Sequence, residues 1–360
     1  MCFEGGVNYI KKGGKEMKTS FRALSYGVLI IVLLFLAVPS VSAQPAKPIT
    51  LKFSHQNPPA SLIHKEPYET FLANLEKRSN GRIKTEYYPA EMLVKSRGDL
   101  PGVRTGVADI QVTVTSYHPE ATPMAGLYML PFAHKSGEEA FRSFMNLKGK
   151  YIMPEMNKLG VKLLAPYLGS NYVLFSADKP VHKISDLKGL RVRSPGAVMS
   201  KVLSKIGSTP MTLASADQYE ALQKRTLDVV AHTYGVLGDT SKIYETTKTG
   251  YIIDAGGLGT FVCLILMNNK SWDRLGPDLQ KIVEEEGINM GAKISRNYDL
   301  GDEHGLKTLL DHGVTHIIWD EGEKSKVKKL VMEVWDEEAA KWNAKGYPAT
   351  QLLNEFKAGR

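Results

Sequence analysis

Strand-like and helical segments alternate through most of this chain. Apolar and polar residues alternate from Ile49 to Ser54, as in a strand, and apolar residues at helical spacing follow from His64 to Ser79. Another strand-like segment runs from Arg82 to Tyr88, and the same order restarts after a helical segment between Glu138 and Leu159. This alternation predicts an α/β fold whose strands pair largely in parallel.

One helical segment is unusually long. It runs from Pro277 to about Asp311, with proline at its first position and apolar residues at helical intervals. At 1.5 Å per residue it would span about 50 Å, which exceeds the width of one domain. The chain of 360 residues is long enough for two domains, so we expect this helix to bridge them. Its glycines leave open whether it is continuous: Gly287, Gly291, Gly301 and Gly305.

The N-terminal region has the pattern of a secretory leader. Basic residues precede an apolar run from Gly27 to Val38, and small residues ending at Ala43 follow it. We interpret residues 17–43 as a cleaved signal peptide and residues 1–16 as an extension of the gene model. The rival interpretation is an uncleaved anchor, but the run is shorter than the roughly 20 residues of a membrane span. We therefore expect a periplasmic protein.

Charge and cysteine content exclude several classes of protein. Removing residues 1–43 takes away five basic and two acidic residues, so the formal charge falls from +8 to +5. This charge is small and dispersed, so no nucleic-acid partner is expected. Cys263 is then the one remaining cysteine; it lies in an apolar run from Phe261 to Met267 and is interpreted as a core residue. A disulfide framework and a cysteine-based zinc site are excluded.

Catalytic motifs are missing or stand in the wrong context. The sequence has no phosphate loop, no Gly-x-Ser-x-Gly elbow and no His-Glu-x-x-His. Ser176 and Lys179 match a Ser-x-x-Lys motif, but the following proline indicates a turn. His312 and His316 have helical spacing, yet Gly313 ends the helix between them. We expect no catalytic residues, no cofactor and no metal site.

Several segments together resemble one protein family. The segment from Ser185 to Gly196, SDLKGLRVRSPG, resembles a signature of the solute-binding proteins of tripartite ATP-independent periplasmic (TRAP) transporters, the DctP type. Other segments that resemble the family occur in the right order: Gly81–Pro89, Gly102–Ile110, Leu130–Phe132, Gly207–Gln223, Leu227–Asp228 and Leu275–Ile282. The resemblance extends over nearly all of the chain after residue 43.

The resemblance implies a two-domain, periplasmic-binding-protein-like α/β fold with a ligand cleft between the domains and a long bridging helix. Family members interleave their domains. On this basis domain I is expected to contain residues 44–168 plus 258–298, and domain II residues 169–257 plus 299–360.

In this family an arginine just before the signature proline binds the ligand carboxylate, and the match places that role on Arg193. Arg193 also closes a predicted strand, and ligands of open α/β sheets bind at the carboxyl ends of strands. A guanidinium can hold a carboxylate through two parallel hydrogen bonds, which lysine cannot do. The alternative for Arg193 is a structural ion pair, which is our interpretation of Arg191.

Departures from the family pattern bear on the ligand. Asn171 stands where sialic-acid-binding members have a second arginine, and the stretch from Thr113 to His118 lacks their charged contacts. A polyhydroxylated sugar acid is therefore not expected. Three candidate contacts, if they face the cleft, would suit a monocarboxylate with an apolar or aromatic body: Tyr117, Tyr172 and Tyr234. The resemblance also implies two polar contacts, His232 as a donor to a second ligand oxygen and Gln56 after the first strand. For each of them the alternative is a core, rim or hinge residue.

The resemblance thus implies a periplasmic solute-binding protein that closes over an organic acid anion and makes or breaks no bond. Its membrane partner would be a TRAP permease with a small and a large integral subunit. Three alternatives stay open: the binding protein of an ATP-driven (ABC) importer, a ligand-sensing domain of a signalling system, and a secreted hydrolase that uses the same cleft.

Overall fold

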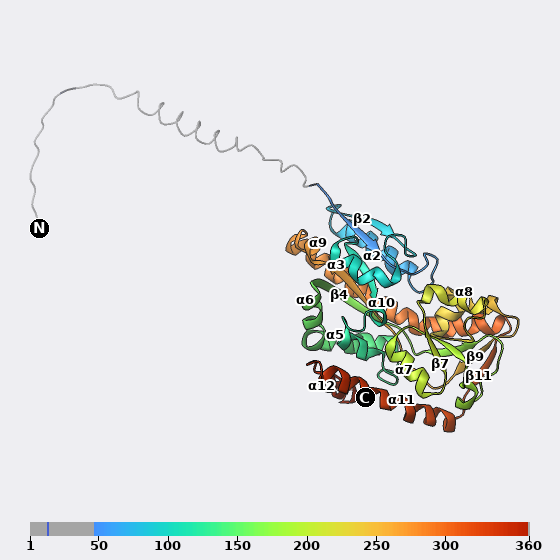
Figure 1. Ribbon diagram of the computed structural model, residues 1–360. Coiled ribbons are helices and arrows are strands. Elements are labelled where there is room, and N and C mark those ends of the chain that lie inside the picture. The colour runs from blue at the N-terminus through green and yellow to red at the C-terminus, as the bar shows by residue number, and fades with distance from the viewer. Residues whose placement is uncertain (1–12, 14–46, 359–360) are drawn as a thin grey trace, which may run out of the picture. The chain divides into compact units, whose positions relative to one another are not determined.

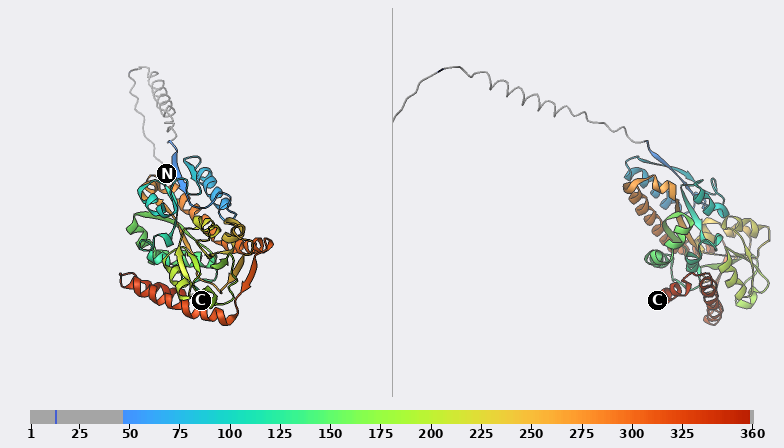
Figure 2. Two further views of the ribbon diagram at one scale, coloured as in Figure 1. Left: turned by 45° about the vertical axis from the view of Figure 1, so that its right-hand side comes forward. Right: turned by 60° about the vertical axis from the view of Figure 1, so that its left-hand side comes forward.

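The computed structural model describes residue 13 and residues 47–358 (Figures 1 and 2). The predicted signal peptide, residues 17–43, lies outside the described residues, as does nearly all of the predicted extension. Within residues 47–358, no helix combines the length and the apolar character that crossing a bilayer requires. The fold is built on two mixed sheets with helices packed around them, which confirms the predicted α/β class.

Sheet A has five strands in the order β2-β1-β3-β10-β4. β1 pairs in parallel with β2 and β3, whereas β10 runs antiparallel between β3 and β4. The strands are β1 (Ile49–Ser54), β2 (Ile83–Tyr88), β3 (Ile110–Val114), β4 (Val161–Leu168) and β10 (Val262–Asn268).

Sheet B has six strands in the order β11-β9-β5-β8-β6-β7. β6 pairs in parallel with β7 and β8, and β9 with β11, whereas β5 runs antiparallel to β8 and β9. The strands are β5 (Val173–Ser176), β6 (Arg191–Ser194), β7 (Thr209–Thr212), β8 (Val229–His232), β9 (Tyr251–Asp254) and β11 (Thr315–Ile318).

The expectation of largely parallel pairing therefore holds only in part: among the described residues five strand pairs are parallel and four are antiparallel. β5 of sheet B directly follows β4 of sheet A, and β10 of sheet A directly follows β9 of sheet B. The chain therefore crosses from one sheet to the other just before β5 and again just before β10. A strand that begins where its neighbours end must run antiparallel to them. The predicted domain limits at 168/169 and 257/258 fall in these two crossings, and the division into domains stays a prediction.

The long helix α10 is continuous from Gly276 to Asp311, 36 residues. It packs against β4 on the side of sheet A and against η6 (Val236–Thr240) on the side of sheet B, so it bridges the two (Figure 1). A methyl group at Gly291 would overlap the Pro166 carbonyl oxygen, and one at Gly305 would overlap that of Tyr234. These two glycines let neighbouring backbone approach the helix closely, and none of the four glycines in the predicted segment interrupts it.

The predicted helix from Glu138 to Leu159 is two helices, α5 and α6. Pro154, in the first turn of α6, has no N–H to continue the hydrogen bonds of α5. The other helices are α2 (Lys65–Arg78), α3 (Asp99–Thr105), α4 (Pro123–Gly126), α5 (Gly137–Tyr151), α6 (Met153–Leu159), α7 (Ala197–Lys205), α8 (Gln218–Gln223), α9 (Asn269–Asp273), α11 (Glu321–Asn343) and α12 (Ala349–Ala358).

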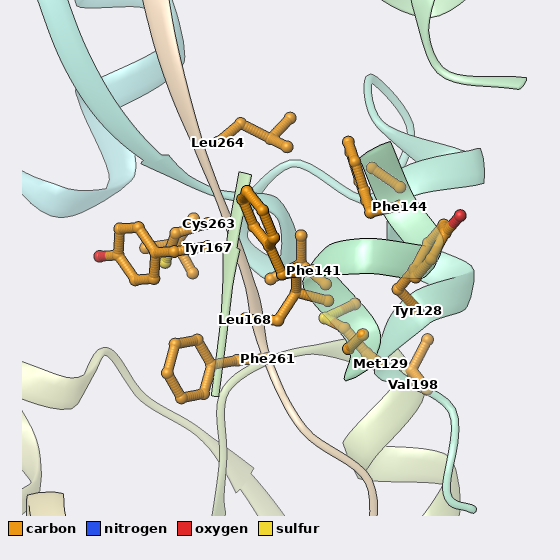
Figure 3. Close-up of a cluster of buried hydrophobic side chains, with 14 of the residues drawn as sticks. Tyr128, Met129, Phe141, Phe144, Tyr167, Leu168, Val198, Phe261, Cys263 and Leu264 are labelled. Carbon is orange, nitrogen blue, oxygen red and sulfur yellow. The ribbon is translucent and has the colours of Figure 1, made fainter. Parts of the chain in front are cut away.

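Part of the hydrophobic core lies on one side of β4 and β10. Figure 3 shows Phe141 and Phe144 packed there, while Tyr167 and Phe261 project from the opposite side. Cys263 is fully buried, which agrees with its interpretation as a core residue. The side from which Tyr167 and Phe261 project is the side that carries the site described next.

Candidate ligand-binding site

A cavity of about 260 Å³ lies between the two sheets, at the strand ends that meet there. Val114 at the end of β3 and Tyr167 near the end of β4 belong to the wall from sheet A. Arg193 near the end of β6 and His232 at the end of β8 belong to the wall from sheet B. Ligand pockets usually enclose about 300–1,000 Å³, so this cavity suits a small molecule.

The structure brings together five of the seven predicted site residues. The cavity wall contains Gln56, Tyr117, Tyr172, Arg193 and His232. Asn171 and Tyr234 are not in this wall. The Asn171 amide donates to the Lys135 carbonyl at 3.4 Å, and the Tyr234 hydroxyl lies 3.3 Å from Nε2 of His316.

Arg193 is a buried cation without an acidic partner. Its side chain is 1% exposed, and it donates to the carbonyls of Leu213 and Ala231, each at 3.2 Å. Among the described residues, no carboxylate lies within ion-pair distance of it, and no other residue of the cavity wall carries a permanent charge. A buried charge is costly unless it is paired. The cavity therefore has the electrostatics of a site for an anion.

Arg191 differs sharply from Arg193, although it lies only two residues earlier on β6. Its Nε and Nη2 donate to the two carboxylate oxygens of Asp228, at 3.0 and 2.8 Å. The pair is partly exposed. Arg191 thus makes the structural ion pair that we expected for it.

Ser116 is a cavity residue that the sequence did not single out. It lies after β3, and its backbone carbonyl is so close to Gly196 that a side chain there would overlap it. Gly196 follows Arg193 in the turn after β6, so this contact holds Ser116 next to that turn. The Ser116 hydroxyl is buried and has no hydrogen-bond partner among the described residues. It is available to donate to a ligand oxygen.

His232 presents a neutral N–H donor. Its Nδ1 accepts the backbone N–H of Thr233 at 2.8 Å, which places the ring proton on Nε2. Burial, and then the nearby charge of Arg193, lower the pKa of His232 well below its usual 6.5. Nε2 lies 3.3 Å from the Ser215 hydroxyl. His232 is therefore an uncharged donor at neutral pH.

Ser215 is another residue that sequence reasoning misplaced. From the sequence alone, Ser215 and Gln218 have the spacing of a capping box and predict that a helix begins directly after Ser215, but this prediction is wrong. The segment from Ser215 to Asp217 is a 3₁₀ turn, α8 begins only at Gln218, and neither has a side-chain cap. The Ser215 hydroxyl contacts His232, and its backbone N–H donates to the Tyr117 hydroxyl at 3.1 Å. Ser215 thus links the two walls of the cavity.

Aromatic rings line much of the remaining wall. The Phe261 ring stacks against Tyr172 with centroids 6.0 Å apart and meets Tyr298 edge-on at 4.9 Å. A side chain at Gly169 would overlap the Phe261 ring, so this glycine leaves room for it. Burial, opposed by Arg193, raises the pKa of Tyr172, which stays neutral. Such a wall suits a flat or apolar ligand body.

No metal site accompanies the cavity within residues 47–358, where no cluster of three His, Cys, Asp or Glu residues could hold an ion. His312 follows α10 and stacks on Tyr244 at 3.9 Å, while His316 belongs to β11. The two histidines with helical spacing therefore lie on different elements.

The chain matches the model of a family described as bacterial extracellular solute-binding protein, family 7, over residues 53–341. It is 25% identical over 327 residues to the C4-dicarboxylate-binding periplasmic protein DctP of Rhodobacter capsulatus, covering 88% of this chain and 93% of that protein. It is 26% identical over 270 residues to the sialic acid-binding periplasmic protein SiaP of Vibrio cholerae, covering 73% and 80%.

In three dimensions the chain is similar to a TRAP solute binding protein from Rhodoferax ferrireducens T118, in complex with copurified benzoate. The TM-score is 0.80 and the sequence identity 27%, with 86% of this chain and 97% of that chain covered. The predicted two-domain periplasmic-binding-protein-like fold with its long helix is thereby confirmed.

Proposed function

Because the chain belongs to the bacterial extracellular solute-binding proteins of family 7, we propose that it captures a small monocarboxylate and delivers it to a TRAP permease. Proteins of this kind bind small molecules and work with membrane permease subunits; they are binding proteins and not enzymes. The curated relatives named above are periplasmic, and we propose the same location for this chain.

The observation that carries the proposal is the buried, unpaired guanidinium of Arg193 in the cavity wall. A ligand carboxylate supplies the missing negative charge through two parallel hydrogen bonds. The Ser116 hydroxyl and the Nε2–H of His232 line the same cavity and add uncharged donors to the carboxylate oxygens.

The charge balance of the wall supports a ligand with one carboxylate. Arg193 is its single permanent charge among the described residues, so a second carboxylate would be buried without a cation. The rings of Tyr172, Phe261 and Tyr298 support an aromatic or otherwise apolar body. The benzoate bound by the Rhodoferax protein, 27% identical to this chain, agrees with that class.

A screen by thermal shift tests this function. The protein is heated with aromatic monocarboxylates, 2-oxo acids, dicarboxylates and sugar acids in separate samples. A ligand present at 100 times its dissociation constant stabilises the folded state by about 2.7 kcal/mol, which raises the melting temperature clearly. We expect monocarboxylates to give the largest shifts. A response to dicarboxylates or sugar acids alone, or to no acid, would contradict the proposal.

We further propose that residues 44–168 plus 258–298 and residues 169–257 plus 299–360 are two domains that close over the ligand. The hydrogen bond from the Ser215 backbone to the Tyr117 hydroxyl then joins the domains across the cavity. Closure around the ion pair excludes water and strengthens it.

Replacing Tyr117 by phenylalanine removes this bond and keeps the ring. Since one hydrogen bond contributes about 0.5–1.5 kcal/mol, we expect roughly a threefold to tenfold faster ligand dissociation, measured by stopped-flow fluorescence. Tyr88→Phe is the control, because the Tyr88 hydroxyl bonds to Glu86 away from the cavity. Equal dissociation rates for both variants would show that the bond does not hold the closed form.

A further inference from the structure

The cavity has a second polar position, in the wall formed by sheet A. Three residues lie side by side there, because Cys263 on β10 is paired with Val114 on β3 and with Tyr167 on β4. All three belong to the cavity wall. Arg193 belongs to sheet B, so these residues lie in the wall contributed by the other sheet.

The Tyr167 hydroxyl is buried and makes no hydrogen bond of ordinary length and angle among the described residues. Two groups lie close to it, the Tyr68 hydroxyl and the Cys263 thiol. The Tyr68 hydroxyl donates instead to Asn57 at 2.9 Å. Burial raises the pKa of Cys263 to about 12, so the thiol is neutral and only a weak hydrogen-bonding group.

The Tyr167 ring is held in place by other rings. The Tyr298 ring stacks against it at 6.3 Å, and the rings of His64 and Phe261 meet it edge-on at 5.7 and 6.5 Å. Figure 3 shows Tyr167 and Phe261 on the same side of β4. The hydroxyl therefore cannot turn out to solvent, and its partner has to come from within the cavity.

A buried hydroxyl without a hydrogen-bond partner destabilises the protein, and a ligand oxygen would supply the missing partner. We propose that the ligand carries an oxygen substituent on its body, away from the carboxylate, and that Tyr167 hydrogen-bonds it. This inference rests on the proposed function, because Arg193 determines that the carboxylate end of the ligand lies against sheet B. The ligand class is a hydroxylated aromatic monocarboxylate.

Isothermal titration calorimetry of the full chain with benzoate, 3-hydroxybenzoate and 4-hydroxybenzoate tests the inference. We expect at least one hydroxybenzoate to bind about tenfold or more tightly than benzoate. In Tyr167→Phe this preference falls to within about twofold, because the variant can no longer hydrogen-bond the ligand hydroxyl. Tyr128→Phe is the matched control: Tyr128 is equally buried but lies on the other side of β4, so the preference is retained (Figure 3).

Folding of the variant is checked by its melting temperature without ligand. Losing an unpaired buried hydroxyl should leave this temperature unchanged or raise it; a clear decrease would mean that Tyr167 has a partner within the protein, against the inference. A hydroxyl preference that survives Tyr167→Phe, or an unaltered chain that prefers benzoate, would also overturn it while leaving the proposed function intact. If none of the three acids binds, the inference fails, whereas the proposed function is decided separately by the thermal-shift screen of all four acid classes.

Discussion

Replacing Arg193 by alanine is expected to weaken binding of the carboxylate ligand by at least about 100-fold. Removing one partner of a buried, hydrogen-bonded charge pair costs about 2–5 kcal/mol, because the other charge is left buried and unpaired. Arg193→Lys should lose most of the affinity as well, since an ammonium group cannot form two parallel bonds to a carboxylate. Calorimetry with the best ligand of the thermal-shift screen measures both losses.

The fold should survive the loss of Arg193. The variant leaves the carbonyls of Leu213 and Ala231 without their donor, but it also removes a buried cation that has no acidic partner. These effects oppose each other, so we expect a native circular dichroism spectrum.

Arg191→Ala is the control, because it removes an arginine from the same strand and breaks contacts outside the cavity, the partly exposed pair with Asp228 and the exposed hydrogen bond to the Arg225 carbonyl. It should leave binding unchanged and lower stability by about 1 kcal/mol at most. If Arg193→Ala binds as tightly as the unaltered chain, the carboxylate is held elsewhere.

Gly291→Ala should destabilise the whole chain by about 3 kcal/mol or more. The added methyl group would overlap the carbonyl oxygen of Pro166 on β4, and neither a strand hydrogen-bonded to β10 nor a continuous helix can move aside easily. Equilibrium unfolding in urea measures the change as a lower midpoint.

Gly149→Ala is the control for this prediction. Gly149 also lies in a helix, α5, but nothing lies within 4 Å of a methyl group placed there. The substitution should stabilise the chain by about 0.5–1 kcal/mol, because alanine has less backbone freedom to lose on folding. If Gly291→Ala behaves like Gly149→Ala, the close contact between α10 and β4 does not limit stability.

Local patterns predicted the elements of this fold better than their pairing. The periodicity from Pro277 to Asp311 predicted α10 to within one residue at its start. It could not decide whether the glycines break the helix, because Gly291 and Gly305 face backbone from β4 and from the residues just before η6. β5 and β10 run antiparallel to their neighbours because the chain reaches each of them from the other sheet. The alternation of apolar and polar residues within a strand does not predict such a crossing.

The site was predicted least well where its residues belong to regular elements. Arg193 could be found because a family resemblance marks it. The sequence pattern predicts only that Tyr167 and Phe261 lie in strands or in the core, and that Tyr298 lies in a helix. Only the register between β4 and β10, and the packing of α10 beside them, brings these three rings together. Ser215 was misread because its hydroxyl bonds to His232 and not to the helix that follows.

The position of β10 within sheet A limits how early this protein can complete its fold during synthesis. β10 lies between β3 and β4, although it leaves the ribosome long after both of them. Until residues 262–268 emerge, β3 and β4 have no strand between them, and their open edges can pair with other chains. A nascent chain that has released only its first two hundred residues thus cannot finish even its first sheet. Completion of the fold is a late event, and the growing chain has to be shielded until then.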